Sequence, residues 1–218
     1  MDPEQFVISR RRKKYRFAKF FNAENCFELE EWVKRPVDTP KIDVLEIGAG
    51  TGFFSVELAS RHPDQTFVAL DVKADRLQRG AYEALEKGVN NVFFVRARAD
   101  QIDQLAPPKS VSSIWVTFPD PFPRERSERR RLMHPYFLAQ YRELLADSGS
   151  LYLKHDNREF FDWSLEQLKE TGWVINEFSF NLHASNLDYN YKVLTSYEIR
   201  WLNEGLETKF VKATKPTN

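Results

Sequence analysis

The glycine-rich stretch at residues 44–52 has the composition of a ligand-binding turn. It reads Val-Leu-Glu-Ile-Gly-Ala-Gly-Thr-Gly, an apolar run that contains one acid and ends in three alternating glycines. Such a run predicts a buried parallel strand that breaks into a tight loop and then opens a helix. Glycine suits a backbone that takes positive φ or lets a ligand approach closely, and a helix N-terminus offers unpaired N–H groups. We therefore predict a nucleotide-binding turn at Gly48, Gly50 and Gly52.

Two acids indicate which nucleotide this turn binds. Glu46 lies two residues before the first glycine, where its carboxylate would repel the pyrophosphate of a dinucleotide. S-adenosylmethionine (SAM) instead brings an ammonium and a sulfonium group there, and the GxGxG spacing differs from the GxGxxG of dinucleotide sites. Asp71 ends an apolar strand about 20 residues after the glycines, where a ribose diol would be bound. Either acid alone could be a helix cap or a solvated loop residue, but together they favour a SAM site.

A proline-rich segment at residues 118–124 presents one further carboxylate. It reads Phe-Pro-Asp-Pro-Phe-Pro-Arg, and it follows an apolar strand. Three prolines fix φ and remove donors, so we expect a rigid, extended loop that holds Asp120 still. An immobile carboxylate beside a cofactor site suits catalysis by positioning. The alternative is a purely structural turn.

Two basic clusters suit a polyanionic partner. Residues 1–20 hold seven basic residues against two acids, with Tyr15 and Phe17 interleaved. Cations that displace counterions and rings that stack on bases are typical of RNA binding. The second cluster lies at residues 124–131, directly after the proline-rich segment. Its basic residues are all arginines, whose guanidinium groups make bidentate phosphate contacts. The phosphate-binding candidates are Arg11, Arg12, Lys13, Arg126, Arg129, Arg130 and Arg131. For both clusters the alternative is a solvated, charged surface.

Strand-like and helix-like segments alternate, which predicts parallel βαβ units in a Rossmann-like α/β fold with helices on both faces of a mostly parallel, seven-stranded sheet. Expected strands lie near 44–47, 66–71, 92–95, 113–117, 149–154, 173–180 and 207–211, and expected helices at 22–34, 53–61, 75–87, 132–146, 159–170 and 195–203. Ligands bind at the carboxyl ends of such strands. Asp100, which follows the third strand, is either an acceptor for an adenine amino group or the N-cap of a short helix.

Composition narrows the class of protein. The 218 residues, 42% of them hydrophobic, suit one α/β domain with a sizeable core. Basic and acidic residues balance at 32 each, so the distribution of charge matters more than its sum. No apolar run has membrane-spanning length and the N-terminus is charged where a signal peptide is apolar, so we expect a cytoplasmic protein. A single cysteine excludes an internal disulfide and argues against a metal site.

Three segments resemble the bacterial tRNA (guanine-N(7)-)-methyltransferases. They are the glycine turn, residues 118–131, and Thr195-Ser196-Tyr197-Glu198 with Gly205. The resemblance runs from about Asp43 to Ala213, and its aromatic-Pro-Asp-Pro segment with a following basic run is its most specific part. It implies a class I SAM-dependent methyltransferase domain at 41–218 after a basic arm and helix at 1–40. The activity it implies is methylation of guanosine at N7 in the tRNA variable loop (position 46), with no obligate protein partner evident.

The resemblance also assigns roles to residues. The cofactor set is Glu46, Gly48, Gly50, Gly52, Asp71 and Asp120, with Asp120 as the catalytic residue, and the substrate set is Arg124, Asp156, Thr195, Ser196, Tyr197 and Glu198. Asp100 is added to the cofactor set from its position after the third strand, not from the resemblance. The chain departs from the family pattern in four places, one of which is the unusual context Lys154-His155-Asp156-Asn157 around the substrate aspartate. Arg124 replaces a lysine, Phe122 replaces a tryptophan, and Arg98-Ala99-Asp100 replaces an Asp-Ala pair.

N7 of guanine has an in-plane lone pair and no proton to lose, so alignment matters more than a general base. We expect Asp120 to position the donor or the base, and Glu198 to accept from the ring and amino N–H groups of guanine. One alternative is a methyltransferase of a small molecule or protein, which would not need the basic clusters. Another is an RNA-binding module without catalysis, which would not bind SAM.

Overall fold

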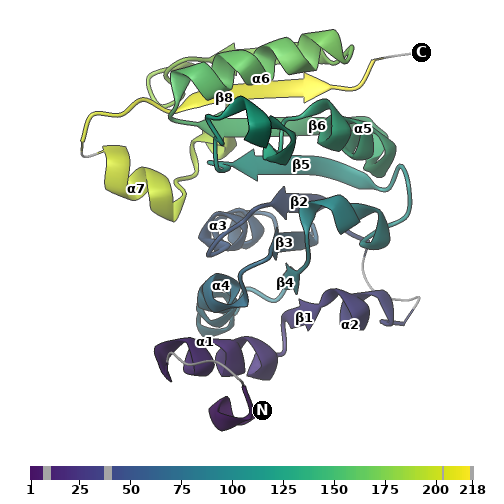
Figure 1. The fold of residues 1–218 in the computed structure, drawn as a ribbon, viewed down its shortest axis with the longest axis vertical. Coiled ribbons are helices and arrows are strands. Elements are labelled where there is room, and N and C mark those ends of the chain that lie inside the picture. The colour runs from purple at the N-terminus through teal and green to yellow at the C-terminus, as the bar shows by residue number, and fades with distance from the viewer. Residues whose placement is uncertain (7–10, 37–40, 203, 217–218) are drawn as a thin grey trace. The chain divides into compact units, whose positions relative to one another are not determined.

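The structure, a computed structural model, describes residues 1–6, 11–36, 41–202 and 204–216 (Figure 1). The chain forms two compact units, Met1–Leu105 and Ala106–Asn218. The described residues contain eight strands, four in each unit, where the sequence predicts seven in all. None of the helices in these ranges is long and apolar enough to cross a membrane.

The first unit is a parallel sheet with the strand order β1-β4-β3-β2. Its strands are β1 (Cys26–Glu28), β2 (Val44–Ile47), β3 (Phe67–Asp71) and β4 (Val92–Arg96). Its helices are η1 (Pro3–Gln5), α1 (Arg11–Asn22), α2 (Leu29–Val33), α3 (Phe53–Arg61), α4 (Ala74–Lys87) and η2 (Ala99–Gln104). Every residue of β2 is buried, as expected for a parallel strand covered on both faces. The pairing places Glu46 opposite Ala69, two residues before the end of β3.

The prediction of a helix over 22–34 is wrong. The residues split into the end of α1, the strand β1 and the short helix α2. The reason is tertiary packing: β1 pairs with β4, and Phe27 packs edge-on against Trp32 and also contacts Phe93. The basic helix α1 packs on α4, with Phe20 buried and Lys19 lying 5.0 Å above the ring of Tyr82. Part of the predicted arm therefore belongs to the first unit.

The second unit is a mixed sheet with the order β5-β6-β8-β7, in which β8 runs antiparallel to both neighbours. Its strands are β5 (Val111–Thr117), β6 (Leu145–His155), β7 (Val174–Ser179) and β8 (Lys209–Thr214). Its helices are η3 (Glu125–Arg130), α5 (Pro135–Leu144), α6 (Arg158–Glu170), η4 (Tyr189–Lys192) and α7 (Ser196–Leu202). Rings pack tightly on this sheet, with Trp115 stacked on Tyr152 at 4.3 Å.

Candidate active site

The glycine turn after β2 is folded against the end of β3. Gly48, Gly50 and Gly52 have φ values of 75°, 58° and 71°, which an L side chain rarely adopts. The N–H of Gly48 donates to the carbonyl of Leu70 at 2.8 Å. The N–H of Gly50 donates to Oδ2 of Asp71 at 2.9 Å. The predicted turn is therefore present, and Asp71 fixes its position.

Both predicted acids of this unit lie at the turn. Asp71 also accepts from the N–H of Lys73 through Oδ1 at 2.8 Å, and burial raises its pKa although these two N–H groups act against the shift. Glu46 is 1% exposed, and its Oε2 accepts from the hydroxyl of Ser55 at 2.6 Å. A buried glutamate is rare unless it is paired. The role of β2 in the sheet does not by itself require a carboxylate at Glu46.

The carboxylates and the open backbone at the glycine turn fit SAM. A Cβ added at Gly50 would meet no atom within 4 Å, so the backbone there is open to a ligand. Carboxylates such as Glu46 and Asp71 accept hydrogen bonds from the hydroxyl and ammonium groups that this nucleoside carries. A phosphate ligand would instead be repelled by them. The residues of the turn therefore match the cofactor expected from the sequence.

Asp100 lies in the first turn of η2, after β4. Its carboxylate pairs with Arg98, whose Nε donates to Oδ1 at 2.9 Å. The N-cap of η2 is Arg98, so the alternative that Asp100 caps this helix is wrong. A contact of Asp100 with adenine stays a prediction.

Close packing at the turn depends on two glycines, one of which the sequence analysis overlooked. A Cβ at Gly52 would lie 2.5 Å from Cε1 of Phe94. A Cβ at Gly80, in the middle of α4, would lie 2.2 Å from the carbonyl oxygen of Thr51. A glycine inside a helical pattern usually has a packing reason, and that signal could have identified Gly80.

We expect Gly52→Ala to weaken both the fold and the binding of SAM. The backbone conformation costs about 1 kcal/mol with a Cβ, and the clash with Phe94 adds about 1–3 kcal/mol. Gly88→Ala is the matched control, because Gly88 has φ 67° but open space around it. Urea denaturation and calorimetric titration with SAM measure the two effects. Equal destabilisation by both variants would show that the contact with Phe94 is unimportant.

In the second unit, the proline loop at 118–124 is anchored at three points. The N–H of Phe118 donates to the carbonyl of Lys154 at 2.9 Å. Nε2 of His155 lies 2.9 Å from the carbonyl of Pro119, and Nε of Arg131 donates to the carbonyl of Pro121 at 3.0 Å. Asp120 stands exposed between these anchors. The loop is not extended throughout, because Phe118 and Phe122 have φ values of 48° and 41°. Backbone strain of this kind typically gathers at functional sites.

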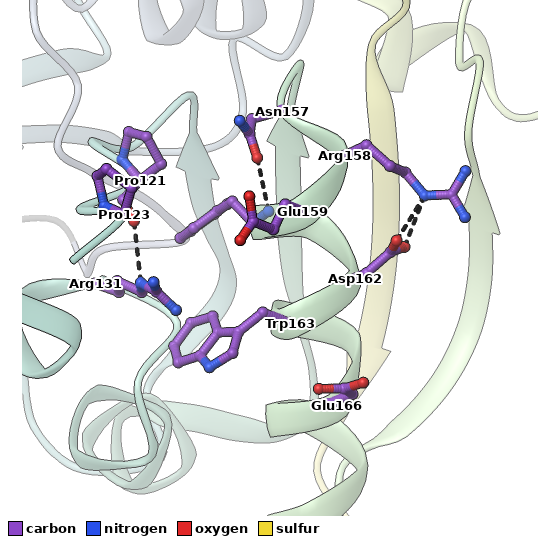
Figure 2. A pocket seen from close by; sticks show the side chains of 10 residues that line it. Pro121, Pro123, Arg131, Asn157, Arg158, Glu159, Asp162, Trp163 and Glu166 are labelled. Atoms are coloured by element: carbon purple, nitrogen blue, oxygen red, sulfur yellow. Dashed lines mark hydrogen bonds and ion pairs between the residues drawn. The ribbon is translucent and has the colours of Figure 1, made fainter. Parts of the chain in front are cut away.

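Arg131 links the proline loop to α6. Its guanidinium lies 4.4 Å from the ring centroid of Trp163 and also donates to the carbonyl of Phe122. Figure 2 shows Arg131 pointing at the prolines, in a cleft of about 670 Å³ whose other wall is α6. Glu159, Asp162 and Glu166 lie along that wall. Arg131 therefore binds the loop. The exposed members of the basic cluster at 124–131 are Arg124, Arg126, Arg129 and Arg130.

His155 joins the proline loop to the start of α6. Its Nδ1 accepts from the N–H of Asn157 at 2.8 Å, so Nε2 carries the proton and donates to Pro119. Burial lowers the pKa of His155, and the carboxylate of Asp156, 3.3 Å from Nδ1, only partly opposes this. The neutral ring is therefore the form that holds the loop.

Low pH should lower the stability that neutral His155 gives to the protein. Because the folded pKa lies below the unfolded value of about 6.5, the unfolded chain takes up a proton first as the pH falls. The free energy of unfolding should therefore drop below about pH 6.5 and level off once the folded ring is protonated. His155→Gln keeps one donor and one acceptor but cannot titrate, so it should lose less stability between about pH 7 and pH 5. Parallel denaturation curves with equal losses would contradict this.

The predicted substrate residues of α7 meet β6 through a buried ion pair. Glu198 is 2% exposed, and its Oε2 accepts from Nζ of Lys154 and from the N–H of Thr195, both at 2.8 Å. Its Oε1 accepts from Nε2 of His183 at 3.0 Å and from the hydroxyl of Thr208 at 3.1 Å. Burial alone would raise the pKa of Glu198, but His183 and Lys154 outweigh it and hold the pKa below its usual value.

Three residues of this cluster were not among the predicted site residues: Lys154, His183 and Thr208. No local pattern marks them, because they come together only through the pairing of β6 with β8 and the packing of the loop after β7. Tyr197 and Asp156 do meet, with the Tyr197 hydroxyl 3.4 Å from Oδ2 of Asp156, and the Tyr197 ring lies 5.1 Å from that of Phe118.

Three predicted residues have side chains outside the described part of the structure: Arg11, Arg12 and Ser196. Lys13 is exposed, with Nζ 5.6 Å from the ring centroid of Phe17. The predicted cofactor residues Glu46 and Asp71 belong to the first unit, and the predicted site residues Asp120, Asp156 and Glu198 to the second.

The family match covers residues of both units. A family described as "Putative methyltransferase" matches residues 40–211. The tRNA (guanine-N(7)-)-methyltransferase of Bacteroides fragilis is 34% identical over 187 residues, 85% of this chain and 73% of that protein. The Geobacillus kaustophilus enzyme of the same name is 35% identical over 79% of this chain and 78% of its own length.

Solved structures agree on the fold. The 16S rRNA (adenine(1408)-N(1))-methyltransferase from Catenulisporales acidiphilia superposes with a TM-score of 0.59 at 17% identity, over 88% of this chain and 94% of that one. The 16S rRNA methyltransferase KamB gives a TM-score of 0.58 at 18% identity, over 80% and 88%. The Rossmann-like class I methyltransferase fold predicted from the sequence is thus confirmed. From these similarities, the chain belongs to the tRNA (guanine-N(7)-)-methyltransferase family.

Proposed function

We propose that this protein transfers a methyl group from SAM to N7 of a guanosine in the variable loop of tRNA (position 46). The observation that carries the proposal is the identity of about one third to relatives of that name over most of both chains. The site residues support it, since each unit contributes buried or fixed carboxylates that a structural role alone does not require.

The first unit supplies the cofactor site. When bound, SAM supplies an electrophilic methyl group on a sulfonium. Asp71 would accept from the ribose hydroxyls with the lone pairs that the N–H groups of Gly50 and Lys73 leave, and Glu46 would favour the cationic end of the ligand. Asp100 is the candidate for the adenine amino group, provided that it leaves its pair with Arg98.

The second unit would supply alignment and recognition. Asp120, fixed by its anchored loop, would position the reacting groups and favour the positive charge that builds on the purine ring. Glu198, held ionised, would accept from the ring and amino N–H donors of guanine. The hydroxyl of Thr195 accepts from the N–H of Glu198, and the hydroxyl of Tyr197 lies beside Asp156. Arg124 extends from the loop that carries Asp120.

Exposed basic residues would hold the tRNA backbone. They are Lys13, Arg126, Arg129 and Arg130 among those with described side chains. Contacts of this kind release counterions, so binding should weaken steeply as salt rises. We further propose that the protein acts in the cytoplasm and needs no obligate protein partner.

The test is transfer of radiolabelled methyl from SAM to unmodified tRNA transcripts, with chemical cleavage at 7-methylguanosine to locate the product. Label at the variable-loop guanosine is the expected result. A transcript with adenosine at that position is the control and should stay unlabelled. SAM binding without any labelled tRNA would overturn the assignment and favour a small-molecule or protein substrate.

A further inference from the structure

Glu198 has all its acceptor positions filled in this structure. A carboxylate offers about four lone-pair sites. Among the described residues, four donors take them: Lys154 and the N–H of Thr195 on Oε2, and His183 and the hydroxyl of Thr208 on Oε1. Because an ionised carboxylate only accepts, Nε2 of His183 must be the donor in its pair. A guanine edge can therefore bind Glu198 only if one donor leaves.

The four donors differ in how readily they can leave. Lys154 is fully buried, Thr208 is 3% exposed, and Thr195 contributes a backbone group that begins α7. The side chain of His183 is 23% exposed, and it lies in the loop between β7 and η4. Removing Lys154 from the carboxylate would leave a buried charge without its counterion, whereas His183 can turn into solvent.

We infer that His183 occupies the position on Oε1 of Glu198 that one N–H donor of guanine takes, and that substrate binding displaces it. His183 is then an internal competitor that keeps Glu198 ionised and oriented until tRNA arrives. This inference rests on the proposed function, because it assigns the guanine edge to Glu198. It makes the apparent affinity for tRNA lower than the intrinsic affinity by the fraction of molecules in which His183 has left.

The experiment compares KM and kcat for tRNA methylation in the wild type, His183→Ala and His183→Gln. Alanine removes the competitor, so KM for tRNA should fall about threefold to tenfold, the change that one hydrogen bond of ordinary net strength gives. Glutamine keeps a donor of similar reach, so KM should stay within about twofold of the wild type. Equilibrium binding of unmodified tRNA by fluorescence anisotropy should show the same order of affinities.

The possible results distinguish a failure of the His183 inference from a failure of the proposed tRNA methylation. If His183→Ala raises KM, the histidine aids binding of the substrate rather than competing with it, and displacement is wrong. If alanine and glutamine variants behave alike, the hydrogen bond to Glu198 does not compete with tRNA, and the inference fails while the function stands. If the wild type labels no tRNA, the proposed function fails first and the inference with it.

Discussion

Asp120→Asn will lower kcat for tRNA methylation by about a hundredfold or more, the usual cost of removing one preorganised electrostatic group. The variant keeps the size and shape of the side chain and removes only its charge. KM for tRNA and the affinity for SAM should change far less, because the charge acts as the purine becomes positive. Single-turnover methyl transfer with radiolabelled SAM measures the chemical step directly.

Asp120→Asn should leave the stability of the protein nearly unchanged. Asp120 is exposed, so the free energy of unfolding should move by no more than about 0.5 kcal/mol. Asp147→Asn is the matched control, since Asp147 is an exposed aspartate at the opposite end of β6 from His155, paired with Lys109 and Lys215. It should leave methylation unchanged. If Asp120→Asn kept its kcat, the proline loop would have a structural role only.

The parts of this protein that follow from local sequence were predictable. A strand that ends in alternating glycines has local causes for its burial and for its positive φ values, and the structure contains it at Gly48, Gly50 and Gly52. The three prolines around Asp120 likewise predict a loop of restricted backbone, but not the positive φ values of Phe118 and Phe122. The position of each strand's carboxyl end follows from the alternation of strands and helices.

The parts that failed depend on long-range packing. The amphipathic pattern of 22–34 predicts one helix, but the pairing of Cys26 and Phe27 with β4 overrides it and adds a strand. Lys154 and Glu198 are 44 residues apart, and only the fold makes the lysine a buried counterion. Similarly, the basic run after the proline loop suggests phosphate contacts throughout, but Arg131 packs on Trp163 instead.

Lys154→Met should have the largest effect on stability of any single substitution in the second unit that we consider. The side chain of Lys154 is 0% exposed and that of Glu198 is 1% exposed. Breaking such a pair from one side costs about 3–5 kcal/mol, because the remaining charge stays buried without its partner. The carbonyl of Val193 also loses its donor, which lies at 2.7 Å. Urea denaturation of the purified variant measures the loss.

The matched control is Lys212→Met. Lys212 pairs with Glu177 at 3.1 Å, but their side chains are 25% and 32% exposed, so the loss should stay below about 1 kcal/mol. If both lysines cost the same, burial of the Lys154 pair would not be the source of its effect.

A double substitution separates stability from function at this pair. Lys154→Met with Glu198→Gln removes both charges, so the double variant should be more stable than the sum of the two single losses predicts. Methylation should nevertheless remain low in the double variant, because glutamine has no charge and offers guanine one accepting oxygen in place of two. Recovery of stability without recovery of kcat/KM would show that Lys154 stabilises the fold by pairing with the charge of Glu198, whereas methylation needs the carboxylate itself. Additive stability losses would show instead that the two side chains contribute independently, and that the lysine does not set the charge of the glutamate.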